Sequence, residues 1–321
     1  MSGQTAAGSY VFGPVPSRRL GRSLGVDLVP YKTCTYDCVY CQLGPTTTKT
    51  CRRRPYVSAN DITDELAAWL DNAIDPSPDY VTLAGSGEPT LNSDIGQVIR
   101  WLKEHTHLPV AVLTNGSLLK LREVRRAVAA ADLLLPSLDA GRPGTFRQVN
   151  RAPGSLRLPH VADGLIAARQ ETAGAMWLEV MLLAGLNDDE EELQSLRRLI
   201  DRIQPERVQI NTVTRPPAES CARALDEEGL SKAAMILGPK AEVIAASQPQ
   251  LRASAGEDGV SARIVELLRR RPCTVTGIAV GLGVHVNAVV KHLGQLLRCG
   301  GVRATDGPNG RHYVATHRGK P

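Results

Sequence analysis

The stretch Cys34-Thr-Tyr-Asp-Cys38-Val-Tyr40-Cys41 places three cysteines within eight residues, in the spacing CxxxCxxC. Three thiolates from one short loop can hold three corners of a cubane iron–sulfur cluster, whereas a fourth cysteine would close the centre. The iron that has no protein ligand can then be chelated by a substrate. The spacing therefore predicts a [4Fe–4S] cluster held by Cys34, Cys38 and Cys41.

A zinc site is the alternative interpretation of this spacing. Structural zinc normally takes four ligands, usually as two separated Cys/His pairs. The remaining cysteines are isolated along the chain: Cys51, Cys221, Cys273 and Cys299. Seven cysteines are an odd number, and their clustering favours metal binding or catalysis in a reducing compartment over disulfides. We therefore expect the iron–sulfur cluster.

Length and composition describe a globular protein. The chain has 321 residues, which predicts one large domain and a smaller one. Aromatic residues make up only 4%, so the core must be built from Leu, Val, Ile and Ala. The first residues are small and polar, so we expect no signal peptide, and no apolar run approaches the length of about 18 residues that a membrane span needs. We expect a cytoplasmic protein.

Short apolar stretches alternate with amphipathic ones from residue 24 to residue 213. The predicted strands are Leu24–Leu28, Tyr80–Ala84, Val110–Leu113, Leu133–Leu138, Trp177–Leu183 and Val208–Val213. The predicted helices are Asp61–Asn72 (with Asn60 as its N-cap), Asp94–Lys103, Leu121–Ala131, Pro159–Glu171 and Glu190–Ile203. Repeated βα units indicate an α/β fold with a parallel sheet. Six units are too few for a closed barrel, so we expect a partial (β/α)6 TIM-like barrel with its site at the carboxyl ends of the strands.

The pattern changes after Pro216. A helix is predicted over Ser231–Ala246, and the polar segment Ser247–Gly259 has the composition of a linker. Helices over Val260–Arg271 and Thr274–Leu282, a third helix and a hairpin over Val302–Val314 follow. This order resembles a winged helix-turn-helix. We expect a core domain over 1–246, a linker over 247–259 and a winged helix domain over 260–321.

The C-terminal segment also carries the basic excess. From residue 257 to the end there are ten Lys and Arg against four Asp and Glu, a net charge of +6, whereas the rest of the chain has a net charge of −1. The third helix has an apolar stripe: Val286, Val289, Val290, Leu293, Leu296 and Leu297. Opposite it lie Asn287, Lys291, Gln295 and Arg298, which would suit contact with nucleic acid. Docking of a protein is the alternative.

The cysteine loop at the end of a first strand, with an aromatic residue before its last cysteine, resembles the radical SAM superfamily. The resemblance implies that S-adenosylmethionine chelates the open iron. One electron then splits the sulfonium, and the resulting 5′-deoxyadenosyl radical abstracts a hydrogen from the substrate. It also implies an external one-electron reductant such as flavodoxin or ferredoxin, and it places Tyr40 near the adenine.

The segment Gly85-Ser86-Gly87-Glu88-Pro89-Thr90 follows the second predicted strand. It resembles the family's GGEP motif with Ser86 as an additional residue. Glycines after a strand let the backbone approach a ligand closely. Glu88 and the exposed carbonyls are expected to accept hydrogen bonds from the ammonium group of S-adenosylmethionine.

Polar residues follow or interrupt the later strands, where the family binds ribose and the methionyl carboxylate. The candidates for this role are Thr114, Asn115, Ser137 and Asp139. Glu179 and Asn211, inside two later strands, would either line the barrel interior and contact cofactor or substrate, or face a cationic partner on the surface of the sheet. Glu179 lies inside an apolar strand, where a carboxylate needs a partner. Gln209 shares a face with Asn211 because side chains alternate along a strand. Arg18 and Arg19, before the first strand, could bind a phosphate or carboxylate of the substrate.

Within this superfamily, the segment from about Val11 to Glu219 resembles one group in particular, the wyosine-synthase-like Fe–S oxidoreductases. It is carried by the opening Gly13–Asp27, the run Cys41-Gln-Leu-Gly44 and the Ser-Gly-Glu-Pro-Thr segment. The related 4-demethylwyosine synthases act on a tRNA guanosine and hold a second cluster through cysteines that precede the CxxxCxxC loop. No cysteine precedes Cys34 here. We therefore expect one cluster and another substrate, such as RNA or a peptide.

Two alternatives stay open. One is the tRNA-modifying enzyme itself, which would need a second cluster. The other is a regulator in which the winged helix contacts DNA and the cluster senses oxygen or iron. A sensor has no need of the GGEP-like segment or of the polar residues at the strand ends, so the sequence favours an enzyme.

Overall fold

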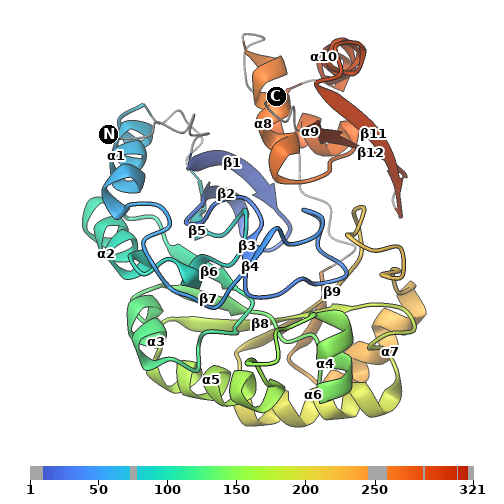
Figure 1. The fold of residues 1–321 in the computed structure, drawn as a ribbon. Helices are drawn as coiled ribbons and strands as arrows, with labels where there is room; N and C mark the ends of the chain where they lie inside the picture. Colours follow the sequence, from blue (N-terminus) through green and yellow to red (C-terminus); the bar gives the residue numbers. More distant parts are fainter. Residues whose placement is uncertain (1–9, 73–77, 245–258, 285, 309, 317–321) are drawn as a thin grey trace.

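A computed structural model describes residues 10–72, 78–244, 259–284, 286–308 and 310–316 (Figure 1). Its main sheet has eight strands in the order β1-β2-β5-β6-β7-β8-β9-β10. The strands are β1 (Val11–Ser17), β2 (Gly21–Val26), β5 (Tyr80–Leu83), β6 (Val110–Thr114), β7 (Leu133–Pro136), β8 (Ala175–Leu182), β9 (Arg207–Thr212) and β10 (Ala241–Val243). Strand β1 runs antiparallel to β2, and every other neighbouring pair is parallel. The predicted α/β fold with a mostly parallel sheet is confirmed.

Helices form an arc around the outside of this sheet (Figure 1). They are α1 (Ala59–Asp71), α2 (Ile95–His105), α3 (Arg122–Val128), α4 (Pro143–Val149), α5 (Leu158–Glu171), α6 (Glu190–Ile203) and α7 (Glu227–Leu237). Their buried faces and the sheet share one hydrophobic cluster built mainly from Leu, Val and Ile. Parallel sheets need cover of this kind because their strands are apolar. No helix in the described residues is long and apolar enough to cross a membrane.

Several sequence predictions need correction. Ser58, not Asn60, caps α1: its side chain accepts a hydrogen bond from the backbone of Asn60. Strand β7 ends at Pro136, two residues before its predicted end at Leu138. Strands β1 and β10, the short pair β3 (Thr33–Cys34) and β4 (Thr48–Lys49), and helix α4 were not predicted.

The helix predicted over Ser231–Ala246 is wrong in its second half. Helix α7 ends at Leu237 because Gly238 takes a left-handed φ of 101°. The chain then adds β10 to the sheet beside β9. Residues 245–258, which contain most of the predicted linker, lie outside the described residues.

The inner face of the sheet is partly filled by the turn between β1 and β2. Leu20 in this turn is buried against Ala111, Leu133 and Leu135. On β8, burial alternates: the even-numbered residues are buried and the odd-numbered ones, including Glu179, are only partly buried. Glu179 therefore shares the inner face with the turn that carries Arg18 and Arg19.

The C-terminal segment has its own hydrophobic cluster. Its elements are α8 (Val260–Arg270), α9 (Val275–Leu282), α10 (Val286–Arg298), β11 (Val302–Gly307) and β12 (Gly310–Ala315). The apolar stripe of α10 is only partly used: Val289 and Leu293 are buried, whereas Val286, Val290 and Leu297 are exposed. The other two helices of this segment, α8 and α9, and the hairpin therefore cover only part of α10.

One ion pair joins this segment to the main sheet. At the end of α8, the guanidinium of Arg270 pairs with the carboxylate of Asp27, just after β2, and lies 3.7 Å from the ring centroid of Phe12 on β1. Only 14% of the Arg270 side chain and 11% of the Asp27 side chain are exposed. The Asp27 carboxylate also accepts hydrogen bonds from the backbone and hydroxyl of Ser86, at 2.6 and 3.1 Å.

We expect Arg270→Leu to lower the free energy of unfolding by about 3 kcal/mol, because Asp27 would stay buried without its cation. Urea titration followed by circular dichroism measures this loss. Arg269→Leu is the matched control, since Arg269 is exposed. Equal losses in both variants would contradict a stabilising role for the Arg270–Asp27 pair.

Candidate active site

The three cysteines of the CxxxCxxC loop lie over the carboxyl ends of the parallel strands. Cys34 belongs to β3, and its carbonyl accepts a hydrogen bond from Thr50 N at 3.0 Å. The backbone of Val39 bonds to Val149 O at 3.0 Å, which ties the loop to the end of α4. Cys34, Cys38 and Cys41 are half-buried and form no disulfide. These contacts anchor the loop that carries the three predicted ligands.

Each of the three sulfur atoms accepts a hydrogen bond from a side-chain nitrogen. The donors are Lys32 Nζ to Cys41 at 3.1 Å, Asn115 Nδ2 to Cys34 at 3.5 Å and Asn150 Nδ2 to Cys38 at 3.5 Å. Donors aimed at sulfur stabilise thiolates and tune an iron–sulfur centre. Among the described residues, no group of three or more His, Cys, Asp or Glu side chains could hold a single metal ion. A cubane would suit this loop, because each thiolate would bind a different iron.

Burial favours the protonated form of two of these thiols, Cys34 and Cys38. Burial, with the nearby charge of Glu88, raises the pKa of Cys34 to about 12. The pKa of Cys38 is raised well above its usual value by burial and by Asp139. Iron binds the thiolate, so loading this site must displace protons from both sulfurs.

Glu88 is buried, and donors from the chain itself meet both of its carboxylate oxygens. Oε1 accepts from Thr90 Oγ1 at 2.5 Å and from Thr114 Oγ1 at 2.6 Å, and Oε2 accepts from Asn115 N at 2.7 Å. Burial raises the pKa of Glu88, and these hydrogen bonds oppose the rise. Glu88 therefore ties the GGEP-like segment to the end of β6, in addition to any contact that it makes with a ligand.

The glycines of this segment lie against the rest of the site. A Cβ on Gly87 would come within 1.9 Å of Thr33 O, one residue before the first cysteine. A Cβ on Gly85, whose φ is 133°, would come within 1.8 Å of Asp27 Oδ1. Pro89 follows in a short 3-10 turn over Pro89–Leu91. The backbone of Ser86 also joins the cysteine loop, because Lys32 N donates to Ser86 O at 2.6 Å.

Tyr40 and Asp139 form a second buried link. Tyr40 OH donates to Asp139 Oδ2 at 2.5 Å, and Asn150 Nδ2 donates to the same oxygen at 2.7 Å. Met181 N donates to Asp139 Oδ1 at 3.0 Å. Burial raises the pKa of Asp139 to about 6, although these hydrogen bonds favour its charged form. Ser137 lies two residues earlier, bridging β7 to Glu179 on β8.

Glu179 has the partners that its position in an apolar strand demanded. It pairs with Arg19, and Asn211 Nδ2 donates to Glu179 Oε1 at 3.0 Å. Burial alone would raise the pKa of Glu179, but Arg19, Asn211 and Arg18 together lower it. Gln209 takes a different role, because its amide donates to Glu242 on β10 at 3.0 Å.

Sequence reasoning missed Lys32, Asn150 and Asp27. Lys32 is 3% exposed, has a left-handed φ of 57° and precedes Cys34 by two residues. Its closeness to the cysteine motif was the one available signal. Asn150 and Asp27 lie far from Cys38 and Ser86 in sequence, so only the fold brings them together.

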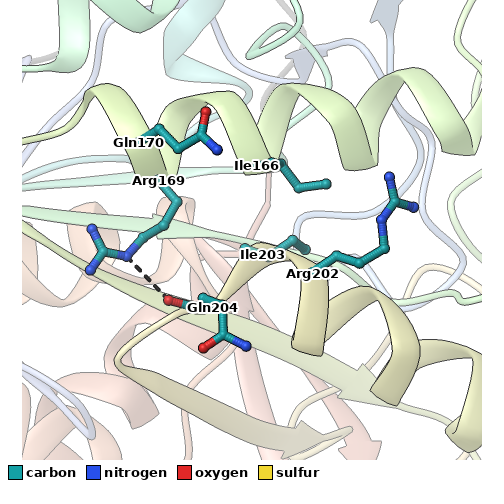
Figure 2. A pocket seen from close by; sticks show the side chains of 6 residues that line it. All are labelled: Ile166, Arg169, Gln170, Arg202, Ile203 and Gln204. Atoms are coloured by element: carbon teal, nitrogen blue, oxygen red, sulfur yellow. Dashed lines mark hydrogen bonds between the residues drawn. The ribbon is translucent and has the colours of Figure 1, made fainter.

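A separate pocket of about 360 Å³ lies between α5 and the end of α6 (Figure 2). Ile166, Arg169, Arg202 and Gln204 line it, with Arg169 Nε donating to Gln204 O at 3.2 Å. None of the residues of the candidate active site lines this pocket. It belongs to the outer helical layer and adds nothing to the chemistry at the cysteine loop.

Residues 28–231 match the model of the radical SAM superfamily, so the chain belongs to that superfamily. Its members are enzymes that use a [4Fe–4S] cluster and S-adenosylmethionine, and they generally need an external electron donor.

Among its relatives, a UPF0026 protein of Methanocaldococcus jannaschii is 34% identical over 70% of this chain and 70% of that protein. A Brachyspira hyodysenteriae protein named GTPase Obg is 38% identical over 91% of this chain, which spans only 43% of that protein. A radical SAM methyltransferase from Sphaerobacter thermophilus shares the fold, with a TM-score of 0.55 and 19% identity over 69% of this chain and 65% of that one.

We expect Gly87→Ala to destabilise the protein by about 1–3 kcal/mol, because the added methyl group would overlap a backbone oxygen of the cysteine loop. Iron content after anaerobic reconstitution should fall with it. Gly144→Ala is the matched control, since no atom lies within 4 Å of a Cβ added there. If both variants melt and bind iron like the wild type, the predicted steric contact does not constrain the loop.

Proposed function

We propose that this chain cleaves S-adenosylmethionine reductively at a cluster held by Cys34, Cys38 and Cys41, and that the 5′-deoxyadenosyl radical abstracts hydrogen from a substrate. The observation that carries this proposal is the set of three sulfur atoms on one loop, each with its own hydrogen-bond donor. When bound, the cluster supplies one electron and an iron that is open to a ligand.

The protein's own groups would position S-adenosylmethionine around this loop. Glu88, whose Oε2 accepts from Asn115 N, and carbonyls of the segment from Gly85 to Pro89 would accept hydrogen bonds from the ammonium. Thr114, Asn115 and Ser137 stand at the ends of β6 and β7, where they would orient the ribose and the carboxylate. Tyr40, held by Asp139, would lie along the adenine. Glu179 and Asn211, on the inner face, would contact cofactor or substrate.

We propose that the open sheet is a partial (β/α)6 barrel and that the chain divides as the sequence predicts, into 1–246, a linker over 247–259 and a winged helix domain over 260–321. Separate hydrophobic clusters in the main sheet and the C-terminal segment support this division. A mostly parallel sheet whose strand order follows the chain suits an open barrel.

Anaerobic reconstitution with iron and sulfide tests the proposed chemistry. With dithionite and S-adenosylmethionine, we expect the wild type to hold about four irons per chain and to release 5′-deoxyadenosine. Cys38→Ser should abolish both, because one corner of the cluster loses its ligand. Cys51→Ser is the matched control and should keep both, since Cys51 lies outside the three-cysteine loop.

An intact cluster that yields no 5′-deoxyadenosine would contradict the enzyme and favour the regulator. The same iron count tests the 4-demethylwyosine-synthase-type reaction. About eight irons per chain would indicate a second cluster.

A second proposal concerns nucleic acid as the partner of the C-terminal domain, with RNA or tRNA as the substrate. Lys291, Gln295 and Arg298 are exposed on α10, as the sequence predicts. The side chain of Asn287 lies outside the described residues. Cations on the exposed face of a helix suit contact with phosphate groups. Such contact does not depend on the base sequence of the nucleic acid.

We expect the double variant Lys291→Gln/Arg298→Gln to bind RNA about tenfold more weakly. The slope of the logarithm of the binding constant against the logarithm of the salt concentration should fall by roughly one to two, because one to two phosphate contacts are lost. Fluorescence anisotropy with labelled tRNA and with duplex DNA measures both quantities. Lys120→Gln/Arg126→Gln removes the same charge from exposed residues of the main domain and should leave binding unchanged. Equal affinities in the two double variants would contradict a nucleic-acid surface on α10.

A further inference from the structure

Four arginines from three separate parts of the chain gather beside the candidate active site. Arg18 and Arg19 lie in the turn between β1 and β2, Arg215 follows β9, and Arg271 follows α8. All four are half-buried. Burial, and then repulsion from the other three guanidinium groups, lowers the pKa of Arg215 to about 9. Burial, and then repulsion from Arg19 and Arg271, lowers the pKa of Arg18. We call these four residues the arginine cluster.

Each member is fixed by its own segment. Ser17 Oγ accepts from Arg19 N and Leu20 N, both at 3.2 Å, and Leu20 is buried on the inner face. Arg215 Nη1 donates to Gln42 Oε1 at 3.0 Å. Arg271 N bonds to Leu267 O at 3.3 Å, which closes α8. The cluster is therefore a property of the packed fold rather than of free surface side chains.

The C-terminal segment is held where it completes the cluster. Arg270, next to Arg271, pairs with Asp27 on the main sheet. The turn of the β11–β12 hairpin meets the residue after Arg215, since a Cβ on Gly307 would come within 3.0 Å of Pro216 Cδ. Contacts on both sides thus bring Arg271 to the other arginines.

Glu179 offsets part of this charge, because its carboxylate attracts Arg18 as well as Arg19. Glu179 pairs with Arg19. Within the described part of the chain, neither Arg215 nor Arg271 forms an ion pair. Holding like charges together in a half-buried place is costly unless an opposite charge compensates it. Groups with perturbed pKa values cluster at functional sites, where a bound anion would offset positive charge of this kind.

The position of the cluster relates it to the proposed chemistry. Arg215 holds Gln42, the residue after the cluster ligand Cys41. Arg19 holds Glu179, on the inner face of the sheet. The arginine cluster therefore contacts both the cysteine loop, through Gln42, and the inner face of the sheet, through Glu179.

We propose that the arginine cluster binds an oxyanion, a phosphate or a carboxylate, on the substrate of this enzyme. The planar guanidinium matches both groups through two parallel hydrogen bonds. Several guanidinium groups around one place suit a ligand with more than one negative charge. This inference names the substrate class and rests on the proposed function for its catalytic meaning, although the binding itself does not depend on catalysis.

Calorimetric titration of the reconstituted protein tests the proposal. The probes are inorganic phosphate and succinate, at an ionic strength held near 0.15 M with sodium chloride, because salt screens exposed charges. We expect the wild type to bind at least one of them. The double variant Arg215→Gln/Arg271→Gln should bind at least about tenfold more weakly, since it loses two charge-assisted contacts. Arg126→Gln, at an exposed arginine outside the cluster, should bind like the wild type.

A second readout separates binding from a structural role. In the absence of the probe, the double variant should melt at a higher temperature than the wild type, because it removes repelling charges. Preference for phosphate or for succinate identifies the source of the oxyanion. A wild type that binds neither probe would overturn the proposal. A double variant that binds the probe as tightly as the wild type would also overturn it, whether or not its melting temperature falls. Loss of 5′-deoxyadenosine formation with binding intact would count against the proposed function alone.

Discussion

Buried carboxylates at the carboxyl ends of the strands set the architecture of this site. A carboxylate withdrawn from water must be met by donors or by a cation, or it will not stay charged. Glu88 is met by the ends of the GGEP-like segment and of β6, and Asp139 by Tyr40, Asn150 and β8. Each carboxylate thus fastens elements that are remote in sequence, and the cysteine loop is held in place by the elements so joined.

Asp27 extends the same rule to the C-terminal segment. Its carboxylate faces Ser86 on one side and Arg270 on the other. Because Ser86 O also accepts from Lys32 N, a continuous set of contacts runs from α8 through the glycine segment to the residue whose ammonium approaches Cys41. The contacts that hold the C-terminal segment against the main sheet are therefore continuous with the contacts that hold the cysteine loop.

The arginine cluster shows the opposite balance. Around Glu88 and Asp139 the protein satisfies each charge from within, whereas around Arg215 and Arg271 it leaves positive charge uncompensated in the described residues. Natural proteins retain such costly local arrangements at functional sites, since selection acts on activity as well as on stability. In the part of the site near the cysteines, hydrogen bonds within the chain compensate the buried charges. The part around the arginine cluster favours an incoming anion.

Local patterns in the sequence were enough to predict the role of the three cysteines, the place of the glycine segment and most of the alternating strands and helices. Spacing and apolar periodicity are properties of neighbouring residues, so they can be seen without the fold. Only the tertiary structure decided the partners. Ser58 rather than Asn60 caps α1, and residues expected to end a helix form strand β10. Asn150 contacts Cys38 although the two residues are 112 positions apart. Those contacts depend on how the sheet orders its strands and on where the C-terminal segment docks, and neither is encoded in the spacing of nearby residues.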